Sequence, residues 1–203
     1  MSERAPQDTS AGHWVSYRPE IKVLDCTIRD GGLMNDHKFG DETVKAVYEA
    51  CVESGIDYME IGYINSRTMF PPGKCGPWKH CQESDIRRIF GDNDTPVKLS
   101  AMADADKSDY KTDVLPKSES VLDLIRVATY IHQIPLALDM IKDAHDKGYE
   151  TSLNLMALST VPESELNEAL AMVAESEADV ICIVDSFGAL YAEQIDGYMD
   201  TFK

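Results

Sequence analysis

Short apolar runs alternate along the chain with longer segments in which apolar residues recur at helical spacing. The apolar runs predict six strands, at 21–26, 57–63, 97–102, 122–129, 149–157 and 179–186. The longer segments predict helices at 41–54, 83–90, 134–148 and 162–177, and a last helix that begins near Tyr191. Because strands and helices alternate, we expect a parallel sheet covered by helices.

The spacing and the strand ends favour a barrel over a doubly wound open sheet. The predicted units average about thirty residues, as βα units of TIM barrels do. The first strand is followed by "DCTIRDGG" and not by the G-x-G-x-x-G turn of a doubly wound sheet. Polar residues gather near the strand ends, namely Arg29, Asp30, Glu60, Asn154 and Asp185. The prediction is therefore a TIM (β/α)8-type barrel, truncated after its sixth strand.

The chain is predicted to hold a flexible leader, residues 1–20, and one partial barrel domain, residues 21–203. Its 203 residues are enough for one sizeable core. The leader lacks the apolar run of a secretory signal, and nowhere do we find the roughly 18 apolar residues of a membrane helix. We expect a soluble cytoplasmic protein without a membrane partner.

The charge balance restricts the partners further. A formal net charge of −17 argues against nucleic acid, whose binding relies on lysine and arginine. An anionic substrate would meet a repulsive field, so its site would need a local cation, either an arginine or a metal ion.

The five cysteines are expected to be reduced thiols, because their number is odd and they are scattered. Cys75 and Cys81, with His80 between them, could form half a zinc site. No second pair follows at a suitable spacing, so the alternative is a loop packed around Trp78.

The stretch "LDCTIRDGG" (24–32) allows two interpretations. Arg29 and Asp30 could neutralise each other in a turn that Gly31 and Gly32 make possible. Alternatively, the strand delivers both side chains to the rim of the barrel, where side chains from several strands converge. Asp25, if it points inward, would need a hydrogen-bonding or cationic partner.

Three motifs together carry a family resemblance. "LDCTIRDGG", "MEIGY" (59–63) and "VDSFG" (184–188) resemble the DRE-TIM metallolyases. This group contains HMG-CoA lyase, isopropylmalate and homocitrate synthases, and 4-hydroxy-2-oxovalerate aldolase. The similarity runs from about Ile21 to the chain end and looks closest to the aldolase-like branch.

The resemblance implies a divalent-metal-dependent carbon–carbon lyase that cleaves 4-hydroxy-2-oxo acids to pyruvate and an aldehyde through an enolate. It also implies residue roles: Asp30 binds the metal ion, Arg29 stabilises the enolate oxygen, and Glu60 supports both. Asp185 matches a rim aspartate, and Asn154 is a weaker substrate-binding candidate. The implied cation is Mn²⁺ or Mg²⁺, with Zn²⁺ possible, and the substrate is a small α-keto or acyl compound.

The chain departs from the family pattern in two places. The His-x-His metal ligands of the family's seventh strand are absent, and Leu33 stands where the aldolase branch has an acid–base histidine. His37 could reach the site from the following loop, although a solvated loop histidine is the preferred interpretation. Two alternatives therefore stay open: a Claisen-type synthase, and a truncated non-catalytic barrel that serves as an interaction module.

An open six-stranded sheet would also expose two strand edges. We therefore expect a homo-oligomer or a complementary C-terminal polypeptide.

Overall fold

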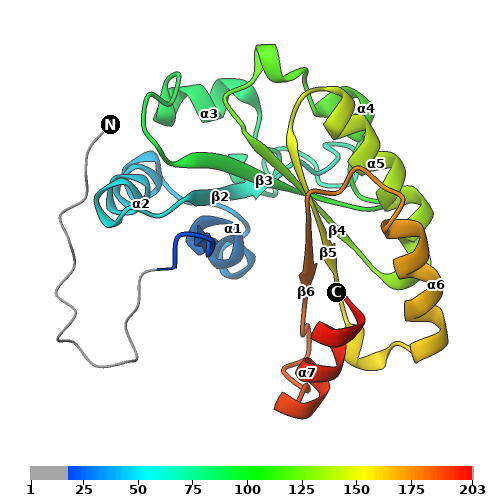
Figure 1. Ribbon diagram of the computed structural model, residues 1–203. Helices are drawn as coiled ribbons and strands as arrows, with labels where there is room; N and C mark the ends of the chain where they lie inside the picture. Colours follow the sequence, from blue (N-terminus) through cyan, green and yellow to red (C-terminus); the bar gives the residue numbers. More distant parts are fainter. Residues whose placement is uncertain (1–17, 203) are drawn as a thin grey trace, which may run out of the picture.

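The computed structural model describes residues 18–202, which form one six-stranded parallel sheet in the order β1-β2-β3-β4-β5-β6. The strands are β1 (Leu24–Asp25), β2 (Tyr58–Tyr63), β3 (Lys98–Asp104), β4 (Leu124–Thr129), β5 (Glu150–Leu155) and β6 (Val180–Ile183). The sheet curls into a half-barrel with helices along its outer side (Figure 1). This confirms the predicted truncated TIM-type barrel. The proposed leader falls mostly on residues 1–17, which lie outside the described part.

Seven α-helices connect or follow these strands in the described part. They are α1 (Thr27–Gly31), α2 (Asp41–Ser54), α3 (Glu83–Phe90), α4 (Tyr110–Asp113), α5 (Ile134–Asp146), α6 (Glu163–Val173) and α7 (Ala192–Thr201). The predicted end of α2 is confirmed, because Gly55 adopts a left-handed conformation with φ of 69° just after it. None of the described helices has the length and apolar character needed to cross a membrane.

The first strand is shorter than predicted. It was expected over 21–26, but only Leu24–Asp25 is paired, and the chain then enters α1. The Asp25 carboxylate accepts hydrogen bonds from Thr27 N at 3.1 Å and from Thr27 Oγ1 at 2.7 Å. Asp25 thus finds its partner two residues ahead, and this local contact favours the helical turn over a longer strand.

The two faces of the sheet differ in chemistry. On the outer face, fully buried apolar side chains pack against the helices; they include Met59, Ile61, Leu99, Ala101, Ile125, Val127 and Leu153. On the inner face the register places Glu60 opposite Ser100, and Arg126 opposite Ser152. Because side chains alternate along a strand, one sheet carries both an apolar core and a polar interior.

The long β2–α3 loop folds around Trp78, as one of the two interpretations predicted. Trp78 is 0% exposed, and its indole N–H donates to the Phe39 carbonyl at 3.4 Å. Cys75 and Cys81 are free thiols, as are the other three cysteines. Within residues 18–202, no group of three or more His, Cys, Asp or Glu side chains is placed to hold a metal ion, so the zinc alternative finds no support there.

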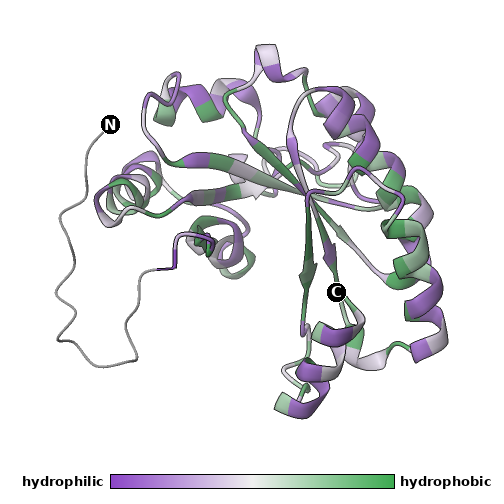
Figure 2. Cartoon of the chain, in the orientation of Figure 1, coloured by the Kyte–Doolittle hydropathy of each residue, from purple (hydrophilic) through white to green (hydrophobic). Residues whose placement is uncertain are grey.

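Both edges of the sheet are open in the described part, because β1 pairs only with β2 and β6 only with β5. Strand β6 is hydrophobic (Figure 2), yet Val180 is 51% exposed. Its side chains therefore contribute less to the core than those of the four central strands.

Gly62 provides a test of how closely β2 and the Trp78 loop approach each other. A Cβ atom at Gly62 would lie 2.1 Å from the Trp78 carbonyl oxygen and 2.7 Å from Cys81 Sγ. We expect Gly62→Ala to lower the free energy of unfolding by about 3 kcal/mol, measured by urea denaturation, because the obstacle is backbone.

The matched control is Gly197→Ala in α7, where a Cβ atom would meet nothing within 4 Å. This change should leave stability equal or raise it by about 0.5–1 kcal/mol, since alanine favours a helix interior. Equal effects of the two substitutions would contradict the close approach.

Candidate active site

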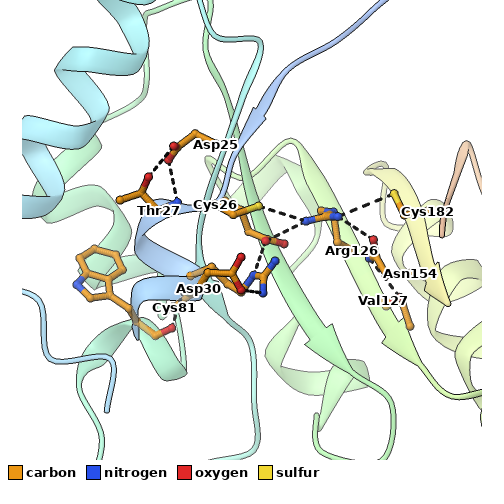
Figure 3. A network of polar contacts seen from close by, with 12 residues as sticks. Asp25, Cys26, Thr27, Asp30, Cys81, Arg126, Val127, Asn154 and Cys182 are labelled. Atoms are coloured by element: carbon orange, nitrogen blue, oxygen red, sulfur yellow. Dashed lines mark hydrogen bonds and ion pairs between the residues drawn. The ribbon is translucent and has the colours of Figure 1, made fainter. Parts of the chain in front are cut away.

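The candidate site is built on one buried carboxylate that two arginines share (Figure 3). Glu60, on the inner face of β2, is 0% exposed. Its Oε2 atom accepts a hydrogen bond from Arg29 Nε at 2.6 Å and lies 2.9 Å from Arg126 Nη1. Burial opposes the charge of both guanidinium groups, but the Glu60 carboxylate raises the pKa of each one above its usual value.

Arg126 extends the network across the inner face to β5 and β6. Its Nη2 atom donates to Asn154 Oδ1 at 2.7 Å, and two thiols, Cys26 and Cys182, each lie 3.9 Å from the guanidinium (Figure 3). Asn154 is buried, and its amide nitrogen donates to the Val127 carbonyl at 3.4 Å. The side chain of Asn154 therefore orients Arg126, while its predicted contact with substrate stays a prediction.

Sequence reasoning missed Arg126. It stands in the middle of the apolar run "LIRVAT", which predicts a buried strand. A buried guanidinium needs a carboxylate partner, and Glu60 lies at an inward position two strands away. An arginine inside an apolar strand was the signal in the sequence that could have indicated a buried charge network.

Asp30 lies beside Arg29 on α1 but points toward solvent. Its carboxylate forms an ion pair with Arg29 Nη1, and its side chain is 58% exposed. Arg29 thus contacts its neighbour, as the first interpretation has it, and also reaches the interior. The second interpretation needs a correction, because both side chains come from α1 and not from the end of the strand. Asp30 offers one accessible carboxylate, so a Mg²⁺ or Mn²⁺ ion held there would take its other ligands from water and substrate.

Asp185 lies apart from this network. Its carboxylate accepts the backbone N–H groups of Ala189 at 3.1 Å and Leu190 at 3.0 Å, in the turn after β6. These backbone hydrogen bonds lower the pKa of the Asp185 carboxyl group, and the bond from Leu190 has the largest effect. The structure thus brings Arg29, Asp30, Glu60 and Asn154 together, whereas Asp185 is engaged in shaping its own loop.

His37 is buried, so the preferred interpretation as a solvated loop histidine was wrong. It is 3% exposed, and its ring meets the Tyr63 ring edge-on with centroids 5.3 Å apart. Its Nδ1 atom would lie 2.2 Å from a Cβ atom at Gly32, so only glycine leaves room for it. Burial, aided by the charge of Lys79, lowers the pKa of His37 to about 4. The imidazole is therefore neutral at physiological pH.

The shared carboxylate can be tested by Glu60→Gln. This change keeps the shape of the side chain but removes the buried anion that two largely buried guanidinium groups share. We expect the free energy of unfolding in urea to fall by about 3–5 kcal/mol. The control is Glu49→Gln, which removes an exposed pair with Lys45 and should cost less than about 0.5 kcal/mol. A loss of stability as small as that of the control would contradict the central role of Glu60.

The burial of His37 predicts a dependence of stability on pH. A histidine has a pKa of about 6.5 in an unfolded chain, against about 4 for His37 in the folded protein. Between these values the unfolded chain binds more protons, so stability should fall as the pH drops from 6.5 toward 4. We expect His37→Gln to reduce the slope of the free energy of unfolding against pH by the equivalent of up to about one bound proton. Urea denaturation across that pH range measures this slope. The exposed His145→Gln is the control, and an equal slope in both variants would contradict the assignment.

Comparison with curated proteins finds aldolases at low identity, although no family model matches the chain. It is 24% identical over 178 residues to 4-hydroxy-2-oxovalerate aldolase 3 of Rhodococcus opacus, covering 87% of this chain and 51% of that protein. It is 23% identical over 185 residues to the oxaloacetate decarboxylase of Mycobacterium tuberculosis, covering 89% and 52%. The chain thus spans about half the length of the curated relatives it matches.

Solved structures agree on the fold. The N-terminal domain of a presumed aldolase from Bacteroides vulgatus superposes with a TM-score of 0.73 at 26% identity, covering 90% of this chain and 60% of that one. The HMG-CoA lyase of Brucella melitensis superposes with a TM-score of 0.60 at 14% identity, covering 90% and 67%. Fold and relatives together are consistent with a DRE-TIM domain of the pyruvate carboxyltransferase type.

Proposed function

We propose that this chain contributes Arg29 and Asp30 to the site of a divalent-metal-dependent carbon–carbon lyase. The proposed reaction is the cleavage of 4-hydroxy-2-oxo acids to pyruvate and an aldehyde. The observation that carries the proposal is the buried Arg29–Glu60 pair beside the accessible carboxylate of Asp30. The relatives named 4-hydroxy-2-oxovalerate aldolase support a lyase of this group. A Claisen-type synthase would use the same pair and is the alternative within the group.

Arg29 would stabilise the negative oxygen that forms when the bond next to the carbonyl breaks. The Glu60 carboxylate holds the guanidinium through Nε at 2.6 Å, so its orientation is fixed before substrate arrives. A donor that is already oriented needs no reorganisation as charge develops, and this favours the transition state. Glu60 thereby acts as the positioning residue for Arg29, and Arg126 shares its charge.

Asp30 would hold the cation, which is Mn²⁺ or Mg²⁺ in this proposal, with Zn²⁺ possible. When bound, such an ion polarises the 2-oxo carbonyl as a Lewis acid. Because Asp30 is the one site carboxylate of the described part with wide solvent access, water and substrate must supply the remaining ligands.

His37 is the proposed proton acceptor, in place of the histidine that Leu33 replaces. The neutral imidazole would take the proton of the 4-hydroxyl group, the C3–C4 bond would break, and its electron pair would move to the 2-oxo oxygen. The resulting enolate is protonated at C3 to give pyruvate. The contact of His37 with Tyr63, whose ring lies 5.9 Å from the Arg29 guanidinium carbon, supports a place near the reacting atoms.

A non-catalytic interaction module remains a second proposal, favoured by the open edges of the sheet. The exposed side chains of Val23, Val180 and Ile181 lie at those edges. A second copy of the chain or a complementary C-terminal polypeptide would cover them. Whichever of the two covers the edges, the small-molecule site at Arg29 stays on the inner face of the sheet.

The lyase proposal is tested by pyruvate release from 4-hydroxy-2-oxo acids with added Mn²⁺. We expect Asp30→Asn to lower the Mn²⁺-dependent rate by about 100-fold or more, because the ligand for the cation is lost. Asp94→Asn, which changes an exposed carboxylate after α3, is the matched control and should retain the wild-type rate. Absence of Mn²⁺-dependent release by the wild-type chain would reject the lyase for this chain and favour the interaction module.

A further inference from the structure

Lys79 is a lysine with a largely buried side chain at the same rim of the sheet as Arg29. It ends the short 3₁₀ helix Pro77–Lys79 in the loop between β2 and α3, and it is 9% exposed. Its Nζ atom lies 4.2 Å from the centre of the Tyr63 ring and 4.6 Å from that of Phe70. Two aromatic faces thus hold one cation.

The charge of Lys79 has no direct partner among residues 18–202. No ion pair or hydrogen bond of its ammonium group is found there, although a lysine carries three donors. Asp104 is the acid whose charge acts most strongly on Lys79, but it already accepts a hydrogen bond from Asn65 Nδ2 at 3.0 Å. Burial lowers the pKa of Lys79 below its ordinary value, and the charge of Asp104 opposes this shift.

Tyr63 links this ammonium group to the candidate site. Its ring lies 4.2 Å from Lys79 Nζ and 5.9 Å from the Arg29 guanidinium carbon, so one side chain contacts both cations. His37 meets the same ring edge-on. Whereas the charge of Arg29 is matched by Glu60 and Asp30, that of Lys79 is not matched by a contact of this kind.

A purely structural role explains Lys79 poorly. Cation–π contacts stabilise a lysine only modestly, whereas taking an unpaired charge largely out of water is more costly. An apolar side chain of similar length would fill the space between Tyr63 and Phe70 without that cost. A bound anion next to Lys79 would offset the cost of burying its charge.

We propose that Lys79 forms a subsite for a second anionic group of the substrate, next to the 2-oxo acid site at Arg29. The substrate class is then a 2-oxo acid with a distal carboxylate, and Lys79 is its specificity-determining residue. The inference rests on the proposed function, because it takes Arg29 and Asp30 as the site of the 2-oxo group. It also accounts for how a chain with a net charge of −17 could attract a dianion.

The test compares two probes of equal chain length, 2-oxoglutarate and 2-oxopentanoate, by calorimetry with the full chain and Mn²⁺. The wild-type protein should bind the diacid about tenfold or more tightly than the monoacid, as one charge-assisted contact allows. Lys79→Met should abolish this preference and leave 2-oxopentanoate binding unchanged. Equal affinity of the wild type for both probes, or an unchanged preference in Lys79→Met, would overturn the subsite.

Two controls separate this outcome from other failures. Lys107→Met removes a nearby cation whose charge acts on Lys79, and it should keep the preference for the diacid. Loss of 2-oxopentanoate binding in Asp30→Asn reports on the proposed function alone; if the wild type binds neither probe, that function fails and the subsite with it.

Thermal unfolding of Lys79→Met completes the test. A melting temperature equal to or above that of the wild type is expected, because methionine packs between the two rings without a buried charge. A fall of several degrees together with an unchanged preference for the diacid would identify Lys79 as a structural clamp and reject the subsite.

Discussion

The carboxylate of Glu60 is the group on which the arrangement of the inner face depends. Three strands and one short helix meet around it: β2 carries Glu60, α1 carries Arg29, β4 carries Arg126, and β5 supplies Asn154. Each guanidinium would be costly to bury alone, and each is oriented because the same oxygen accepts from both. The relative positions of α1 and β4 are thus fixed by electrostatics, in a region where the sheet offers little apolar contact.

This division of labour follows from the alternation of side chains along the strands. The outer face supplies the apolar burial that stabilises the domain, and the inner face can therefore carry charge. Near the rim, the inner face becomes apolar again where Tyr63, Met102 and Ala128 contact one another. Charged groups such as Lys79 reach the rim from loops, which can fold over this apolar band without disturbing the strands.

The fold and the site were predictable from the sequence to different degrees. The six strands and their parallel order follow from local periodicity, and the structure confirms them. The motif residues Arg29, Asp30 and Glu60 lie together as the resemblance implied. His37 and Lys79 were not predictable in this way, because their burial depends on the 19-residue loop 64–82 folding back onto β2. Arg126 was missed because its partner Glu60 lies far away in the sequence, and periodicity relates only residues that are close in the sequence.

The short helix α1 has a consequence for the order of the letters in "RDGG". Successive residues of a helix point about 100° apart, so Arg29 and Asp30 cannot face the same way. The first turns inward to Glu60 and the second outward to solvent. The same two residues in the opposite order would set two carboxylates against each other inside and leave a guanidinium outside. The motif therefore encodes a direction as well as a composition, and a search that accepted either order would retrieve chains unable to build this interior.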